Sequence, residues 1–165
     1  MNNLFPTTKQ KYVMTDETII VNGKTLYRIK AVRSFFDVKE GDLGGYVEHE
    51  NNLSHDFESW IYHNAKVCGN AQIFGNAIIR DSATVCHNAI VQGNANVCGN
   101  AIVGGSANVC DFAVVGDSAK VLGNAVVSDV ARVIDFAIVR GNANVCQYEI
   151  VCDSEIVSGD ATNII

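Results

Sequence analysis

NANVCGNAIVGGSANV, residues 94–109, is the clearest indication of the fold, because it repeats one pattern every six residues. An Ile or Val opens each unit, and a small residue follows four positions later. From Ile61 to Val157 every sixth residue is Ile or Val, without insertion or deletion, and alanines accompany them from Ala65 to Ala143. A period of six does not match the 3.6 residues of an α-helix turn. The pattern is typical of a parallel β-solenoid whose Ile/Val and Ala side chains face inward.

Short polar pairs separate the inward positions and predict the corners of this solenoid. Examples are Gly99-Asn100 and Asp81-Ser82. Glycine and asparagine tolerate the left-handed backbone angles that a tight corner needs. We also expect the asparagine side chains of successive coils to hydrogen-bond along the axis.

A second period, of 12 residues, bears on the size of one coil. The residues that flank the inward Ile/Val alternate between apolar and polar, as at Ile102 and Asn108 or at Cys98 and Gly104. Residues one coil apart stack about 4.8 Å apart. Two hexads per coil would turn each alternating set into a ladder of like residues, so we favour flattened 12-residue coils. The alternative is three hexads per coil, the triangular left-handed form in which this pattern usually occurs.

The two-hexad coil predicts one apolar flank along the rod. An apolar strip of this length is unexpected on a monomer, and it has the area of a specific interface. We therefore expect a homodimer, or another protein partner, docked along the strip, with a trimer expected if the coil holds three hexads. The predicted interface residues are Phe74, Ile78, Cys86, Ile90, Cys98, Ile102, Cys110, Phe112, Val114, Leu122, Val126, Ile134, Phe136, Ile138, Cys146, Tyr148 and Ile150.

Composition excludes several classes of function. The net charge of −6 disfavours direct nucleic-acid binding, because a phosphate backbone requires a basic surface. No apolar run has the roughly 20 residues of a membrane span, and the first residues lack a signal-peptide core, so a cytoplasmic protein is expected. The six cysteines form no Cys-x-x-Cys pair and exchange with Leu, Ile and Phe at equivalent positions. We interpret them as reduced, small apolar residues, and expect no metal and no cofactor.

Residues 1–60 do not follow the six-residue pattern, and we predict that they form a β-rich cap. The solenoid is expected at 61–162, followed by a tail at 163–165. Residues 18–29 read as a hairpin with an Asn22-Gly23 turn. The cap would cover the open strand edge of the first coil. Its core is expected to be aromatic and to contain Phe35, Phe36, Tyr46, Phe57 and Trp60.

The head motif resembles a known family. Asp37-Val38-Lys39-x-Gly41-x-x-Gly44-Gly45-x-Val47, then Asn52-Leu53-Ser54 and Trp60-Ile61-Tyr62, together with the repeats, are similar to the YdcK-like hexapeptide-repeat proteins of bacteria. Those proteins carry a transferase label because their repeats resemble those of left-handed β-helix acyltransferases. The resemblance implies a hexapeptide solenoid, and it carries over no catalytic residue.

Three functions follow from these observations. The unbroken register favours a non-catalytic scaffold or protein-interaction module. The alternative is an acyltransferase acting on a small molecule, which would need a histidine base in reach of its substrate; the candidates are His49, His55, His63 and His87, of which only the last lies at a corner well inside the repeats. A second alternative is an acidic solenoid of phage or mobile-element origin that inhibits a nucleic-acid-binding enzyme.

Overall fold

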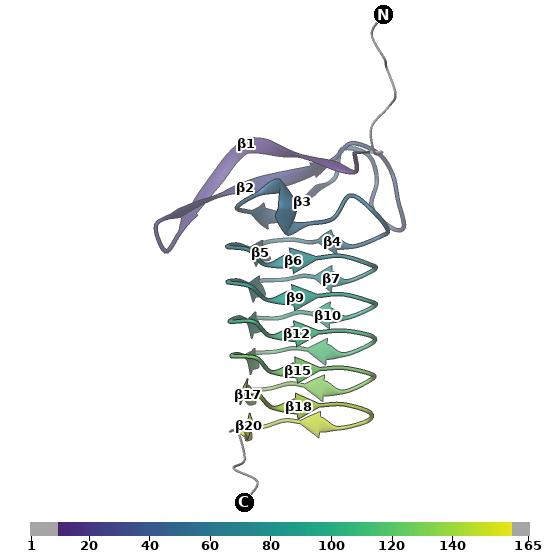
Figure 1. Ribbon diagram of the computed structural model, residues 1–165. Coiled ribbons are helices and arrows are strands. Elements are labelled where there is room, and N and C mark those ends of the chain that lie inside the picture. Colours follow the sequence, from purple (N-terminus) through teal and green to yellow (C-terminus); the bar gives the residue numbers. More distant parts are fainter. Residues whose placement is uncertain (1–9, 160–165) are drawn as a thin grey trace, which may run out of the picture.

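The chain is an all-β parallel β-solenoid of about six turns, with an antiparallel hairpin region at its N-terminal end (Figure 1). The structure is a computed structural model that describes residues 10–159. Three parallel walls run the length of the rod, and the chain passes through the first, second and third walls in turn. Because every strand from residue 60 onward is two to four residues long, each wall is a narrow stack of short strands.

The first wall is continuous with the cap, so its sheet has nine strands. They are β1 (Tyr12–Val21), β2 (Lys24–Ala31), β3 (Leu43–Val47), β5 (Lys66–Val67), β8 (Thr84–Val85), β11 (Ile102–Val103), β14 (Lys120–Val121), β17 (Ile138–Gly141) and β20 (Ile156–Gly159).

The second wall has five strands and the third has six. The second wall consists of β6 (Gln72–Ile73), β9 (Ile90–Val91), β12 (Asn108–Val109), β15 (Val126–Val127) and β18 (Asn144–Val145). The third wall consists of β4 (Trp60–Ile61), β7 (Ile78–Ile79), β10 (Asn96–Val97), β13 (Val114–Val115), β16 (Arg132–Val133) and β19 (Ile150–Val151).

One coil contains 18 residues, so the prediction of two hexads per coil was wrong. Val97 pairs with Ile79 on one side and with Val115 on the other, and the same offset of 18 holds along all three walls. The physical reason lies in the corners: each hexad contributes one left-handed residue, and three corners close one lap. Outward side chains contribute little to the closure of a coil. The columns of like outward residues that a 12-residue coil would give therefore did not determine the coil size.

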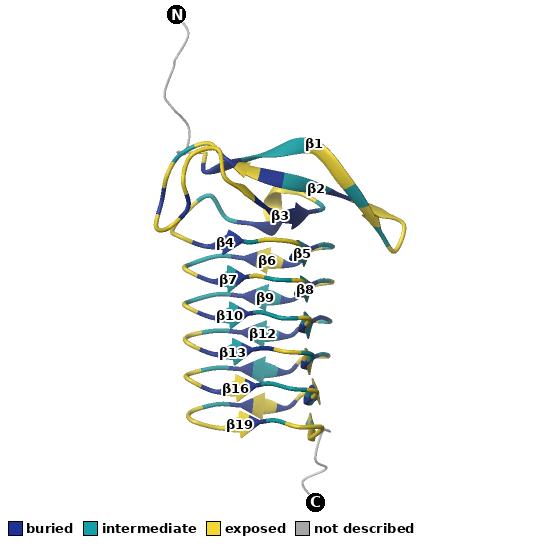
Figure 2. Cartoon of the chain, turned by 180° about the vertical axis from the view of Figure 1, so that it is seen from behind, coloured by how far each residue is buried: buried dark blue, intermediate teal, exposed yellow. Residues whose placement is uncertain are grey.

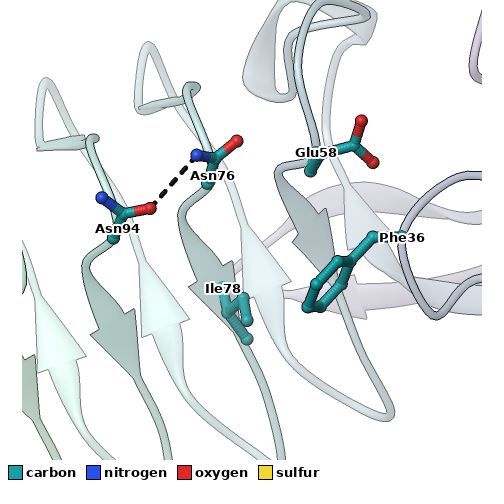
Figure 3. Close-up of a pocket in the computed structure, with 5 residues that line it drawn as sticks. All are labelled: Phe36, Glu58, Asn76, Ile78 and Asn94. Carbon is teal, nitrogen blue, oxygen red and sulfur yellow. Dashed lines mark hydrogen bonds between the residues drawn. The ribbon is translucent and has the colours of Figure 1, made fainter.

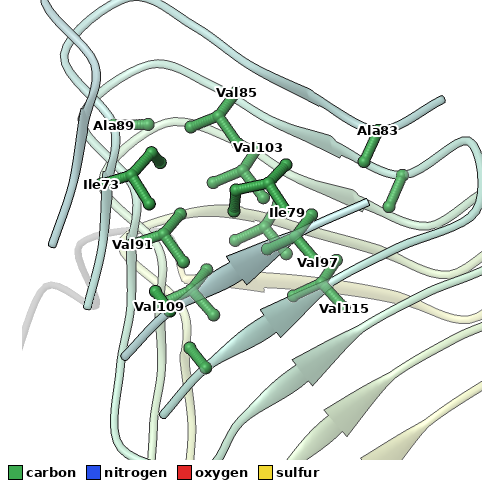
Figure 4. Close-up of a cluster of buried hydrophobic side chains, with 14 of the residues drawn as sticks. Ile73, Ile79, Ala83, Val85, Ala89, Val91, Val97, Val103, Val109 and Val115 are labelled. Atoms are coloured by element: carbon green, nitrogen blue, oxygen red, sulfur yellow. The ribbon is translucent and has the colours of Figure 1, made fainter. Parts of the chain in front are cut away.

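The core confirms the predicted inward positions. Every Ile or Val of the hexad register from Ile61 to Val139 is fully buried, and so is every alanine between Ala65 and Ala137. Figure 4 shows these side chains converging on the axis, with Val85 and Val103 of the first wall near Ile79 and Val97 of the third. The small alanines let the chain turn close to the axis, and the branched residues fill the remaining space.

The corners confirm the predicted left-handed backbone at glycine, but not at the asparagine that follows it; in other hexads an aspartate takes the left-handed position. Every sixth residue from His63 to Asp153 has a positive φ. Where this residue is Asp, with the exception of Asp153 in the last coil, its carboxylate accepts the backbone N–H one coil further on, as Asp129 does from Gln147 at 2.9 Å. The expected asparagine ladder is present as well, because Asn76 donates to Asn94 and Asn124 to Asn142 at 3.0–3.1 Å. These contacts satisfy polar groups that a bare corner would leave to water.

The cap begins with the predicted hairpin, whose turn is Asn22-Gly23 with φ of 50° and 77°. β3 joins the hairpin to the rod, since it pairs antiparallel with β2 and parallel with β5. Leu53, after the 3-10 turn η1 (Glu50–Asn52), bridges Ile73 at the start of the second wall. The first lap of the rod therefore already includes β3, Leu53 and β4, and residues 163–165 lie outside the described part of the chain.

Trp60 forms the centre of the cap core. Phe35 meets its ring edge-on at a centroid distance of 5.3 Å, and Tyr12 does so at 6.2 Å. The Tyr12 hydroxyl donates to the carbonyls of Glu50 and Leu53, and burial raises its pKa. Phe36 and Phe57 do not join this core, contrary to expectation. They are 75% and 69% exposed, because each lies at a left-handed residue of a loop that turns its side chain outward.

Candidate functional site

The predicted interface residues do not form one strip, because an 18-residue coil distributes a 12-residue period over three walls. Along each wall apolar and polar residues alternate, as in Ile102, Lys120 and Ile138 of the first wall. Cys86, Ile102, Leu122 and Ile138 belong to the first wall and its corner. Phe74, Ile90, Cys110, Phe112, Val126, Cys146 and Tyr148 belong to the second, and Ile78, Cys98, Val114, Ile134, Phe136 and Ile150 to the third.

Six of these residues nevertheless gather on the C-terminal half of the third wall and on the two corners that flank it. Phe112 and Tyr148 stand on the corner between the second and third walls, 61% and 86% exposed, with Val130 between them at 41%. The three are spaced by 18, so they form one column. Figure 2 shows exposed residues along the lower coils. We call this surface the C-terminal patch: Phe112, Val114, Val130, Ile134, Phe136, Tyr148 and Ile150.

Neighbouring coils of the third wall connect the two corners of the patch, with Arg132 between its apolar residues. β13, β16 and β19 pair in register, which places the outward side chains of Val114, Arg132 and Ile150 above one another. Phe136 extends the surface to the next corner, where it is 68% exposed. A shallow groove of about 390 Å³ runs along the Phe112–Val130–Tyr148 column. The arrangement is suited to binding a flat apolar surface.

Acidic corners border the patch on both sides. Asp111 and Asp129 lie beside the aromatic column, and Asp117, Asp135 and Asp153 line the opposite corner. Each of Asp111, Asp117, Asp129 and Asp135 accepts a backbone N–H from the next coil. The carboxylates are therefore held at the rim, and Arg132 lies exposed in the centre.

A groove at the junction of cap and rod is the second surface feature. It measures about 270 Å³ and is lined by Phe36, Glu58, Asn76, Ile78 and Asn94 (Figure 3). Asn76 and Asn94 bond to each other in the corner ladder. An adjoining hollow holds Tyr62, whose hydroxyl donates to Asp37; burial and this carboxylate raise the Tyr62 pKa. The polar groups here fasten the cap loop to the rod.

The histidines lie in separate settings. His49 and His55 approach different carboxylates, Glu48 at 3.4 Å and Glu50 at 3.1 Å, and His63 lies 3.3 Å from Asp81. His55 also stacks on Tyr12 and accepts the backbone N–H of Lys11, which makes it part of the cap. His87 occupies a corner of the rod, with its Nδ1 3.1 Å from the Cys86 sulfur. Within residues 10–159 no three His, Cys, Asp or Glu side chains are arranged to hold a metal ion.

Glu48 connects the cap to the first full coil. Its carboxylate accepts the backbone N–H of Gly69 at 2.6 Å and the Lys24 ammonium at 2.9 Å. The N–H of Gly69, followed by Lys24, lowers the Glu48 pKa below its ordinary value of 4.5.

We expect Glu48→Gln to remove an acid-sensitive part of the stability. Because folding lowers this pKa, the carboxylate stabilises the protein above about pH 4.5, and the contribution is lost as pH falls through the folded-state value. Urea midpoints at pH 7 and pH 3 measure the effect: the wild type should exceed the variant at pH 7, and the gap should narrow at pH 3. A gap that is constant with pH would contradict the assignment.

Comparison with known proteins does not place the chain in a family. No protein-family model matches the chain, and no curated protein matches it. No helix among residues 10–159 has the length and apolar character to cross a membrane. The class of protein that the structure defines is a parallel β-solenoid with an N-terminal hairpin cap.

Proposed function

We propose that this protein is a non-catalytic protein-interaction module that pairs with a second copy of itself through the C-terminal patch. The observation that supports the proposal best is the column of Phe112, Val130 and Tyr148, three apolar side chains stacked at exposed corner positions. Apart from Phe136, the other equivalent corner positions from Asn64 to Asn142 carry Asn or Ser, and three pairs of these asparagines bond along the axis. Phe and Tyr make no such bonds, so the corner itself gives no reason for them.

The area of the patch is of the size that a dimer needs. Given the exposed fractions of its residues, and about 150–250 Å² for a whole aromatic side chain, the patch offers on the order of 600 Å². A standard specific interface buries about 800 Å² per partner, part of which comes from its polar rim. Burial of this apolar surface supplies the driving force, from which the cost of association is subtracted.

A second copy is the occupant that the symmetry favours. Two-fold pairing uses the same patch on both chains, so one apolar surface suffices. A cyclic trimer, which the sequence linked to three-hexad coils, needs two different complementary surfaces. In a two-fold pair the apolar side chains on either side of Arg132 meet, while the acidic corners remain at the rim, where water and salt screen their repulsion.

The family assignment is part of the same proposal. The motif from Asp37 to Val47 supports membership of the YdcK-like hexapeptide-repeat proteins, and a scaffold role is compatible with that resemblance. The transferase label of that family rests on fold, and fold alone does not confer an activity.

Sedimentation equilibrium tests the pairing. At tens of micromolar the wild type should have twice the chain mass of 17.7 kDa, and the double variant Phe112→Ser/Tyr148→Ser should be a monomer, because it removes the two most exposed aromatic rings of the corner column. The matched control is Phe36→Ser/Phe57→Ser, which removes two equally exposed rings from the cap and should stay dimeric. A monomeric wild type, or a dimer that survives loss of Phe112 and Tyr148, would contradict the proposal.

A further inference from the structure

Two of the six cysteines lie directly above one another. Cys68 and Cys86 follow β5 and β8, whose residues Val67 and Val85 pair in register. They are the one pair of cysteines in the sequence separated by 18 residues, which is one coil. Adjacent strands lie about 4.8 Å apart, inside the Cα separation of roughly 4.4–6.8 Å that a disulfide spans. A bond between the two sulfurs therefore requires no large movement of the rod.

His87 and Gly104 define the surroundings of the Cys86 sulfur. The imidazole Nδ1 of His87 lies 3.1 Å from it. Gly104, one coil further on, leaves this space free: a Cβ there would lie 3.3 Å from the Cys86 sulfur and 3.5 Å from the His87 nitrogen. Both cysteines are half-buried at the surface, so a small molecule can reach them.

Electrostatics distinguish the two thiols. The neighbouring Cys68 thiol, and then the imidazole of His87, lower the Cys86 pKa. The neighbouring Cys86 thiol, together with burial, raises the Cys68 pKa, and Glu48 adds to the increase. Lys24 is close enough to favour the anionic form of either sulfur. With His87 beside it, Cys86 is therefore the more acidic thiol of the pair.

We propose that Cys86 and Cys68 form a peroxide-reactive site, in which Cys86 attacks the peroxide and Cys68 closes an intrachain disulfide. In the first step the Cys86 thiolate attacks one oxygen of a hydroperoxide; a sulfur–oxygen bond forms, the oxygen–oxygen bond breaks, and the departing oxygen takes a proton to leave as an alcohol or water. In the second step the Cys68 sulfur attacks the Cys86 sulfenic acid; the disulfide forms, the sulfur–oxygen bond breaks, and hydroxide leaves with the Cys68 proton as water. The two thiols supply the two electrons that reduce the peroxide.

The four other cysteines fit the apolar interpretation and serve as internal controls. Cys98, Cys110, Cys146 and Cys152 have no cysteine one coil away. Cys98 gives the closest match, because Gly116 lies one coil above it as Gly104 lies above Cys86, and a Cβ at Gly116 would be 3.4 Å from the Cys98 sulfur. His87 has no counterpart there, since Gly99 follows Cys98.

Peptide mass mapping after treatment with one equivalent of hydrogen peroxide tests the proposal. The wild type should form a Cys68–Cys86 disulfide, and Cys86 should react roughly tenfold faster than Cys98. In Cys68→Ser a dimedone-trapped sulfenic acid should accumulate on Cys86, whereas Cys86→Ser should yield neither product. Gly104→Ala should slow the reaction of Cys86, and the matched change Gly116→Ala should leave it unaltered.

Three results would overturn the inference: equal rates at Cys86 and Cys98, a Cys68→Ser variant without sulfenic acid at Cys86, or disulfides formed chiefly between chains. Far-UV circular dichroism establishes that each serine variant is folded before its reaction with peroxide is measured. The experiment works equally well on the Phe112→Ser/Tyr148→Ser variant, so its outcome is independent of pairing through the C-terminal patch.

Discussion

Val103→Asp abolishes cooperative folding of the rod, whereas Ile102→Asp at the adjacent position leaves it folded. This is the result we expect, because the two residues of β11 point in opposite directions. Val103 is fully buried, between Val85 and Val121 in the first wall. A carboxylate there would meet only apolar side chains, and a buried unpaired charge costs about 4 kcal/mol or more. Because neighbouring coils share one core, the damage spreads along the axis.

Ile102 provides the matched control. Its side chain is half-buried on the outside of the wall, beside Thr84 and Lys120. Aspartate can remain hydrated there, with Lys120 on the next coil, so the expected change in unfolding free energy is within about 1 kcal/mol. Urea denaturation followed by circular dichroism measures both variants. Equal loss of stability in the two would contradict the assignment of inward and outward positions.

Gly45→Ala should separate the cap from the first coil. A Cβ at Gly45 would collide with the carbonyl oxygen of Ala65 and with Cγ2 of Ile61, and neither atom can move without shifting the first lap of the rod. Overpacking of this kind costs about 3 kcal/mol or more where backbone is involved. Trp60, the single tryptophan, reports directly on the junction because it is buried against Phe35 and Tyr12.

Trp60 emission should shift to the red in Gly45→Ala, and its urea midpoint should fall, while the far-UV signal of the coils changes less. Gly116→Ala is the control, since a Cβ at that position would have its nearest contact at 3.4 Å, with the Cys98 sulfur. If Gly45→Ala behaves like Gly116→Ala, β3 does not dock as described.

The positions that recur in every hexad, inward and corner residues alike, could be predicted from the sequence. The features that depend on the number of hexads per coil could not. Inward residues such as Val97 and corner residues such as Gly99 were predictable, because burial and a left-handed backbone each demand few residue types. Coil size was not, since all hexads present the same inward pair and are interchangeable in the core. The start of the rod could not be predicted from the repeat either. Leu53 and Ile61 are eight residues apart instead of six, so the six-residue register is broken before β4.

The same limit applied to the candidate sites. Phe112 and Tyr148 were among the predicted interface residues, but Val130, which lies between them, is not related to either by a spacing of 12 and was not predicted. Cys68 was missed for the same reason, because only a period of 18 places it beside Cys86. The contact between Cys86 and His87 is set by the corner geometry, which a one-dimensional pattern does not contain.

Interchangeable hexads also constrain how such a gene can change length. Adding or removing six codons would preserve the buried Ile/Val and Ala positions, so the shorter or longer protein should still fold. Every residue downstream, however, would move to the next wall, and Phe112 would no longer share a column with Val130 if the change fell between them. Only multiples of 18 residues keep all columns aligned, and each such addition would lengthen the rod by about 4.8 Å. The core therefore tolerates changes of six residues in length, whereas a functional surface tolerates only changes of 18.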